Sequence, residues 1–453
     1  MYTKVVCRFL KYFIPNKLEK IAKETGFMVR NSKLLVDTFV KALTLSCLDA
    51  RNITEEIIAH KCSLIQNGVS LTKQAISYRL EKCIPFLKKL ISLAMSKYYR
   101  DVMDDSCLKL SDIFSDVKLL DATTISLPDN LYEDYRGMGG RNAKSSLKIQ
   151  TVYSAVHHTI SHFDITSGVT HDVNEWDNIV QKLTENELII ADLGYYDFEA
   201  FRKISEHNYF LSRIKKNRKF YVVDADSKSG YKTINLTNLL KQSKDFLDTE
   251  VYIKSVNGEM LKVRLVGNRL NNRIAQKRIQ KSVLNNNKKN ISSNLKILLH
   301  WNLVITNVPK EKLSASIVSE LYRLRWQIEL LFKSLKSSFG IDKINTGSKN
   351  YAEAIIYGRL LGAVLTMPLY DSLNTTMLKT KGRGISMIRF YKLYIVSANA
   401  LVVQNLFKLS TYHNFCDNLL KIAKLSLTEK RVRQTTYAKI ESLLGILMEF
   451  GKT

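Results

Sequence analysis

The order of segments from residue 116 onward constrains the fold more than any other feature of this sequence. VKLLDATTISLP, LKIQTVYSAVHH and TISHFDITSG are rich in Val, Ile and Thr and are separated by turn residues, which predicts three strands. ELIIADLG then predicts a buried strand, DFEAFRKISEH a helix and NYFLSRI another strand. This order predicts a mixed α/β sheet flanked by helices, with carboxylates at the strand ends.

The segment before this sheet has a helical pattern. Residues 1–105 include LTKQAISYRLEKCIPFLKKLISLAM, whose apolar residues recur at helical spacing. We expect Ser70 to cap this helix and Pro85 to kink or divide it. Basic residues occupy its other faces, which is compatible with a DNA-binding module or with a plain helical support domain.

Two further segments follow the predicted sheet. Within 217–308, the dipeptide Asn257-Gly258 lies between two alternating runs and predicts a tight hairpin, so we expect a β-rich insertion here. A long helix is expected from about Lys310, and 371–453 carries helical apolar repeats. The sequence thus predicts a core made of 115–216 and 309–370, interrupted by the insertion and followed by a helical C-terminal segment.

The charge of the chain indicates a polyanionic partner. Lys and Arg number 69 against 42 Asp and Glu, which gives a net charge of +27. From Met260 to His300 there is no acidic residue, and the loop NNRIAQKRIQKSVLNNNKKN lies within this stretch. We expect the stretch to contact phosphates, although a charge that only aids solubility stays an alternative. Its basic residues are Lys262, Arg264, Arg269, Arg273, Lys277, Arg278, Lys281, Lys288, Lys289 and Lys296.

Cysteine spacing and hydropathy indicate a location inside the cell. The six cysteines form no CxxC pair, which argues against a zinc ribbon and a disulfide framework. The apolar run at 360–370 contains Pro368 and is shorter than the roughly 18 residues that a membrane span needs. The N-terminus lacks the pattern of a signal peptide. We therefore expect a cytoplasmic protein with no membrane partner.

One stripe of the helix predicted over LSASIVSELYRLRWQIELLFKSLKSSFG carries polar side chains. At 100° per residue, Tyr322, Arg325, Glu329 and Lys336 lie beside the apolar face of this helix. A carboxylate flanked by Arg, Lys and Tyr can bind a metal while its neighbours hold phosphates. The alternative is a solvated helix in which Glu329 pairs with Lys333.

Two more carboxylates interrupt strongly apolar strands. Asp121 lies in KLLDATTI and Asp192 in ELIIADLGYYD, where a charge is costly unless it is paired or bound to a metal. With Glu329, they form an oxygen-ligand set suited to Mg2+ or Mn2+, and two such ions support phosphodiester displacement. Either Asp alone could instead be a turn or capping residue.

These residues resemble the signature of bacterial DDE transposases of the insertion sequence four type, a family that includes the transposon five transposase. The resemblance rests on the spacing of Tyr322, Arg325, Glu329 and Lys336 and on the segments around Asp121 and Asp192, and it covers about 118–338. It implies a ribonuclease-H-like catalytic core, with a β insertion between the last core strand and the helix that carries Glu329.

The same resemblance implies roles for single residues. Asp121, Asp192 and Glu329 would bind two Mg2+ or Mn2+ ions, and Tyr322, Arg325 and Lys336 would contact DNA phosphates. Arg213, in the second Asp segment, would also contact DNA. Trp301, in LLHWNLVITNVP, would stack on a flipped base, although a Trp in an apolar strand can equally be a core residue. The implied partners are double-stranded DNA, both element ends and target, and a second copy of the chain during synapsis.

Other interpretations remain open. His157, His158, His162 and His171 suggest zinc, but neighbours in a strand point to opposite faces, and no Cys is close in sequence. The favoured function is a cut-and-paste transposase in the bacterial cytoplasm, associated with the nucleoid when bound to DNA. A stand-alone nuclease and a catalytically inactive DNA-binding protein derived from a transposase are the alternatives.

Overall fold

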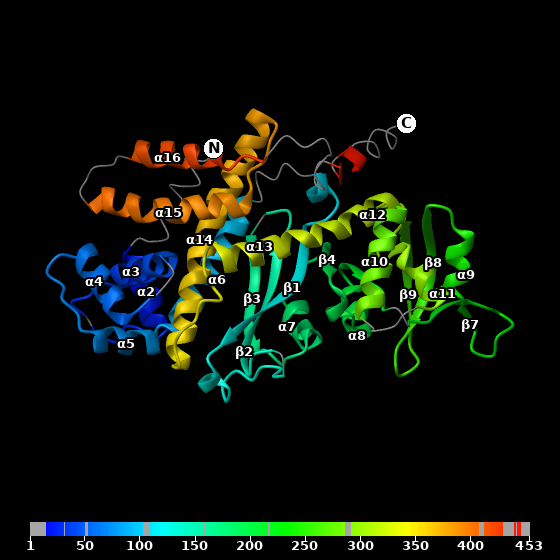
Figure 1. Ribbon diagram of the computed structural model, residues 1–453, viewed down its shortest axis with the longest axis horizontal. Coiled ribbons are helices and arrows are strands. Elements are labelled where there is room, and N and C mark those ends of the chain that lie inside the picture. Colours follow the sequence, from blue (N-terminus) through cyan, green and yellow to red (C-terminus); the bar gives the residue numbers. More distant parts are fainter. Residues whose placement is uncertain are drawn as a thin grey trace. The chain divides into compact units, whose positions relative to one another are not determined.

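The structure is a computed structural model, and packing divides the chain into two compact units (Figure 1). The first unit contains residues 1–106, 122–170 and 327–432, and the second contains 107–121, 171–326 and 433–453. The described residues are 15–30, 32–49, 53–102, 109–140, 142–157, 159–215, 218–285, 291–406, 412–428, 439–440 and 442–444. This grouping reflects packing alone, and the predicted domain boundaries stay a prediction.

The described strands form one ten-stranded sheet in the order β3-β2-β1-β4-β5-β10-β9-β8-β6-β7. β4 pairs in parallel with β1 and with β5, whereas β2 and β3 pair antiparallel. The mixed α/β sheet is therefore confirmed, and its first five strands lie where the sequence predicts them. They are β1 (Asp116–Leu127), β2 (Ser145–Ser154), β3 (Thr159–Ser167), β4 (Glu187–Ala191) and β5 (Tyr209–Arg213).

Two short helices support the strands of the second unit. α7 (Trp176–Val180) precedes β4, and α8 (Phe198–Ile204) connects β4 to β5, as expected for a crossover between parallel strands. The ring of Phe201 on α8 stacks on Phe210 of β5 with centroids 4.3 Å apart. The Trp176 indole donates to the Tyr195 carbonyl at 2.8 Å, which fixes the chain just after β4.

The N-terminal part of the first unit is helical, as predicted. The α5 N-cap is Thr72, whose hydroxyl accepts from the Ala75 amide, so the expectation that Ser70 caps this helix is wrong. Pro85 is the second residue of α6, where its missing N–H costs nothing, and the predicted division is confirmed. The helices are α2 (Pro15–Glu24), α3 (Val36–Asp49), α4 (Glu55–Ile65), α5 (Lys73–Lys82) and α6 (Ile84–Val102).

A long helix forms the core of the first unit. α14 (Lys349–Lys381) packs against α6 and α3, and in Figure 1 it is the yellow helix beside α6. It is long and apolar enough to cross a membrane, but 94% of its most apolar window is buried inside the protein. α15 (Met387–Leu406) and α16 (Tyr412–Leu425) follow. The predicted boundary at 370 falls inside α14, because Pro368 does not end this helix.

The insertion over 217–308 contains helices as well as strands, so the expectation of a β-rich segment is only partly right. The hairpin is confirmed: Lys254 of β8 pairs with Met260 of β9, and Gly258 takes a φ of 96° in the turn. The segment expected as a basic loop forms helix α10 instead. The elements are β6 (Phe220–Val223), β7 (Tyr231–Ile234), α9 (Leu236–Gln242), β8 (Phe246–Lys254), β9 (Met260–Arg269), α10 (Asn272–Asn285), α11 (Ser293–Leu299) and β10 (Trp301–Thr306).

The helix expected from about Lys310 is divided into three pieces. α12 (Ala315–Leu321) is followed by the 3-10 turn η7 (Tyr322–Arg325), and α13 (Trp326–Ser337) continues from it. The polar stripe was derived with a rotation of 100° per residue along the whole helix. This rotation does not apply between Tyr322 and Arg325, because a 3-10 turn has three residues per turn.

Candidate active site

Two aspartates lie next to each other where the parallel pairing of β1 with β4 stops. The β1–β4 register ends with Leu120 opposite Ala191, and the next residue of each strand is Asp121 or Asp192. Neighbouring strands lie about 4.8 Å apart, so the register brings the two carboxylates together. Their side chains are 21% and 39% exposed, which leaves both accessible from solvent. Two like charges at this spacing favour a cation between them.

Arg325 supplies a positive charge to both carboxylates. Its Nη1 donates to Asp121 Oδ2 at 3.1 Å, and its Nε lies 3.9 Å from Asp192 Oδ1. The Tyr322 hydroxyl donates to the same Asp192 Oδ1 at 3.2 Å. Two of the predicted neighbours, Tyr322 and Arg325, thus lie beside the carboxylates in the second unit.

The 3-10 turn explains why both side chains face the aspartates. Residues three apart eclipse in a 3-10 helix, and Tyr322 and Arg325 are the first and last residues of η7. In a regular α-helix the same two residues would diverge by about 60°. The local tightening therefore directs both side chains toward the ends of β1 and β4.

Tyr322 is buried between the carboxylates and a second arginine. It is 4% exposed, and the Arg213 guanidinium lies 5.2 Å from its ring centroid. Burial raises the pKa of Tyr322 and nearby Asp192 raises it further, while Arg213 and Arg325 lower it. The hydroxyl therefore stays protonated as a donor to Asp192. Tyr195 is also buried, and burial, followed by the charges of Asp172, Asp121, Glu175 and Asp192, raises its pKa.

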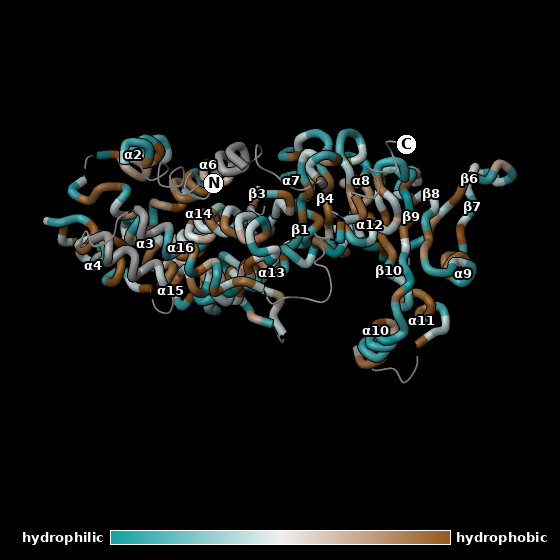
Figure 2. The backbone as a smooth tube through the Cα atoms, turned by 90° about the horizontal axis from the view of Figure 1, so that it is seen from above, coloured by the Kyte–Doolittle hydropathy of each residue, from teal (hydrophilic) through white to brown (hydrophobic). Residues whose placement is uncertain are grey.

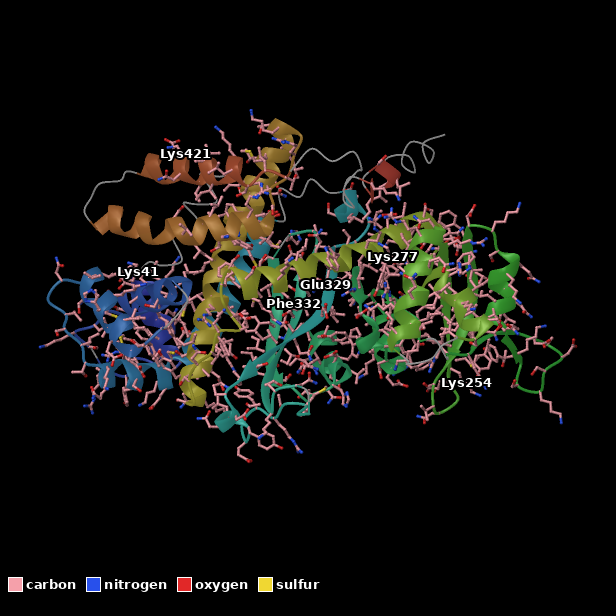
Figure 3. The ribbon with its side chains drawn as sticks, in the orientation of Figure 1. Lys41, Lys254, Lys277, Glu329, Phe332 and Lys421 are labelled. Carbon is pink, nitrogen blue, oxygen red and sulfur yellow. The ribbon has the colours of Figure 1, made fainter. Side chains whose placement is uncertain are left out.

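The other two signature residues belong to the first unit. Glu329 lies on α13 one turn after the end of η7 and is partly exposed, and Figure 3 labels it with Phe332. Lys336, two turns further on, donates to the Thr124 carbonyl of β1 at 3.0 Å. No three His, Cys, Asp or Glu side chains within the described ranges are grouped to hold a metal ion. This also leaves the zinc hypothesis without a site among those residues, and His158 lies outside them.

Two tryptophans of the second unit, Trp301 and Trp326, differ in how deeply their side chains are buried. Trp301 of β10 is only 4% exposed and packs beside Gly267, so it is a core side chain here and the expected base-stacking role is not supported. Trp326, directly after Arg325, is 58% exposed. An exposed Trp beside an arginine suits contact with a base, and sequence reasoning missed it because it stands in a run of mostly apolar residues.

The predicted phosphate surface over 260–300 also needs a correction. Arg264 is 4% exposed and binds both Asp248 oxygens at 2.7 Å, so it stabilises the hairpin and cannot face DNA. Arg278 is half-buried and donates to the Trp301 carbonyl. Lys288 and Lys289 lie outside the described residues. Half of the exposed basic residues that remain are on α10: Arg273, Lys277 and Lys281, beside Lys262, Arg269 and Lys296 elsewhere.

Comparison with known proteins identifies the class. A family model described as the transposase DDE domain matches residues 113–365, more than half of the chain, and the chain therefore belongs to this family. This segment includes every residue of the candidate site.

Individual relatives agree with the family. The transposase for insertion sequence element IS231F of Bacillus thuringiensis subsp. israelensis is 28% identical over 394 residues, covering 83% of this chain and 82% of that protein. The transposase for IS1151 of Clostridium perfringens is 26% identical over 393 residues, covering 83% and 82%. The structure of the piggyBac transposase synaptic complex with hairpin DNA aligns over 96% of this chain and 87% of that chain, with 10% identity and a TM-score of 0.38. The protein is a DDE transposase.

Proposed function

We propose that this transposase is of the insertion sequence four type and moves its element by cut-and-paste, cleaving the element ends and joining them to target DNA. The observation that carries the proposal is the pair Asp121 and Asp192 at adjacent strand ends, both held by the Tyr322–Arg325 turn. The strand order β3-β2-β1-β4-β5, with β1, β4 and β5 parallel, supports a ribonuclease-H-like core.

We further propose that Asp121, Asp192 and Glu329 hold two Mg2+ or Mn2+ ions. Asp121 and Asp192 fit such ions, because these two carboxylates already share one cationic group and oxygen ligands are those that Mg2+ prefers. When bound, the ions would activate the attacking oxygen and stabilise the leaving oxygen in phosphodiester displacement. The support for Glu329 is its position one turn after Arg325, at the spacing of the signature.

The neighbouring side chains have separate tasks in this proposal. Arg325 neutralises both aspartates in the protein alone, and its guanidinium becomes available for a DNA phosphate once metal ions balance their charge. Tyr322 orients Asp192 through its hydroxyl and presents its ring to Arg213. Arg213, Arg325 and Lys336 would bind phosphates close to the scissile bond.

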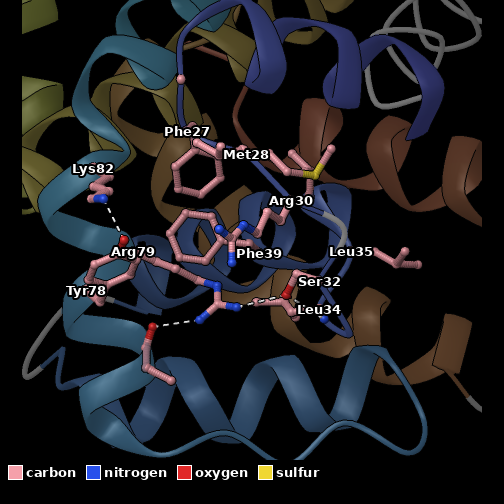
Figure 4. Close-up of a pocket in the computed structure, with 14 residues that line it drawn as sticks. Phe27, Met28, Arg30, Ser32, Leu34, Leu35, Phe39, Tyr78, Arg79 and Lys82 are labelled. Carbon is pink, nitrogen blue, oxygen red and sulfur yellow. Dashed lines mark hydrogen bonds between the residues drawn. The ribbon is translucent and has the colours of Figure 1, made fainter.

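The N-terminal helices would recognise the element ends. α5 exposes Lys73, Tyr78 and Lys82, and beside it lies a pocket of about 730 Å³ with an apolar floor that includes Phe27 and Phe39 (Figure 4). Lysine and tyrosine side chains on an exposed helix are suited to phosphate and base contacts. We propose that two copies of the chain pair the two ends, in the bacterial cytoplasm at the nucleoid where their DNA lies.

The decisive experiment is cleavage and strand transfer on the inverted repeats that flank the gene. Asp121→Asn, Asp192→Asn and Glu329→Gln should each abolish cleavage with Mg2+ while DNA binding persists, because metal ligation and phosphate contact use different residues. Glu185→Gln is the matched control, since Glu185 is exposed at the opposite end of β4 and should leave activity unchanged. Cleavage without joined products would favour the stand-alone nuclease, and full activity in a site variant would refute the triad.

A further inference from the structure

Helix α10 carries an exposed row of basic side chains. Arg273, Lys277 and Lys281 are four residues apart and exposed, so they lie along one face of the helix. Figure 3 labels Lys277, and Figure 2 shows α10 beside α11, standing off one side of the sheet. Neither helix contains an acidic residue, and neither does the chain between them. The charges are therefore not balanced from within this helical pair.

An adjacent face of α10, about 100° around the helix from Lys277, is fixed to the sheet. Arg278 donates to the Trp301 carbonyl at 3.3 Å and to Asn302 Oδ1 at 3.1 Å, both on β10. These bonds orient the helix, so that the row of Arg273, Lys277 and Lys281 is held toward solvent. A fixed row of charges loses less conformational freedom on binding than independent surface lysines do.

A chain of cationic contacts connects α10 to the catalytic aspartates. Burial lowers the pKa of Arg278, and the charge of Arg213 lowers it further. Arg213 in turn covers the ring of Tyr322, whose hydroxyl binds Asp192. Two guanidinium groups that repel each other beside an active site are stabilised when a phosphate lies between them.

We propose that Arg273, Lys277 and Lys281 of α10, together with Arg278 and Arg213, form a surface that tracks the phosphates of duplex DNA leading away from the cleavage site. Successive charges on α10 are about 6 Å apart along the helix axis, close to two base-pair steps of one DNA strand. This inference rests on the proposed function and adds where the DNA lies beyond the scissile phosphate. The element end and the target DNA offer the same backbone chemistry.

The test is the salt dependence of DNA binding by the full-length triple variant Arg273→Gln, Lys277→Gln, Lys281→Gln. Glutamine keeps the helix propensity, and circular dichroism would verify folding. The logarithmic slope of affinity against salt should fall by roughly 0.9 per lost contact, or about 2.7 in total. Affinity between 50 and 200 mM salt should then decline roughly 40-fold less than in the unmodified protein.

A matched control separates a local contact from a general charge effect. The triple variant Lys241→Gln, Lys244→Gln, Lys254→Gln removes equal charge from exposed positions of the same unit, and Figure 3 labels Lys254 at the end of β8. Its slope should stay close to that of the unmodified protein. The salt slope is measured separately with a duplex that carries the element end and with an unrelated duplex. If the slope of the α10 variant falls with only one of them, that DNA is the one that contacts the helix.

Two outcomes would overturn the inference: an unchanged slope on both duplexes, or an equal fall in the control variant. Failure of the triad variants to abolish cleavage would instead count against the proposed catalytic site, so the two proposals fail separately.

Discussion

A buried ion pair between β1 and β4, the two strands that position Asp121 and Asp192, provides a quantitative test of the fold. Lys118 Nζ on β1 lies 2.6 Å from Glu187 Oε2 on β4, and their side chains are 8% and 1% exposed. Thr184 donates to the other Glu187 oxygen at 2.7 Å. Asp116, which lies opposite Glu187 in the register, is fully buried as well. Lys118 is thus the cation that pairs with the buried carboxylate of Glu187.

Lys118→Met should therefore lower the free energy of unfolding by about 3–5 kcal/mol, because it leaves Glu187 charged, buried and without its cation. The double variant Lys118→Met, Glu187→Met should cost less than the single one, since no unpaired charge remains at this pair. Urea unfolding followed by circular dichroism measures both values. The single variant should also lower DNA cleavage, because the pair fixes β1 beside β4.

The control is an exposed ion pair of the same unit. Lys203 Nζ lies 2.9 Å from Asp177 Oδ1, with side chains 45% and 77% exposed, so Lys203→Met should cost less than about 1 kcal/mol. The reasoning would be refuted if Lys118→Met cost no more than Lys203→Met, or if the double variant cost the sum of its two single variants.

Three further results are expected. Arg325→Gln removes the cation shared by Asp121 and Asp192, so Mn2+ should raise the melting temperature of this variant more than that of the unmodified protein; an equal shift would contradict the shared-cation role. Gly358→Ala places a Cβ 2.6 Å from Cys47 Sγ and should cost about 1–3 kcal/mol in thermal unfolding, with an unchanged melting temperature as the contrary result. Burial raises the pKa of Cys47 from 9.0 to about 12, so its contribution to stability is present below pH 9 and is lost as pH rises toward 12. Above pH 9, Cys47→Ala should show an unfolding free energy that falls less steeply, by about 1.4 kcal/mol per pH unit, and an equal slope would show that the thiol does not titrate.

The sheet could be predicted from the sequence because each strand carries its own local signal. β1 to β5 are short runs of Val, Ile, Thr and aromatic residues between turn residues, and the Asn257-Gly258 hairpin needs only its dipeptide. The two aspartates were detectable for the same reason, since a carboxylate at the end of an apolar strand stands out. Their pairing in register required the structure, because it depends on a contact between distant segments.

The features that the sequence did not show depend on tertiary packing. Arg264 counts as one more positive charge in a basic stretch, and only its contact with Asp248 reveals a buried structural residue. Trp301 and Trp326 both lie in apolar segments, yet one is buried and the other exposed. The segment of α10 was expected as a loop because it is rich in Asn, Gln and basic residues, and its few apolar residues give only a weak helical pattern.

The position of β4 in the sheet determines when the active site can form during protein synthesis. β4 pairs with β1, although β2, β3 and α7 lie between these two strands in the sequence. β2 and β3 can pair as soon as both have left the ribosome, whereas β4 must first close a long loop to reach β1. Chains fold from the N-terminus during synthesis. Asp121 is therefore made first, and Asp192 can lie beside it only after β4 has been synthesised and has paired with β1. A chain interrupted before β4 therefore carries the N-terminal helices and Asp121 but not Asp192, and under the proposed function we expect it not to cut DNA.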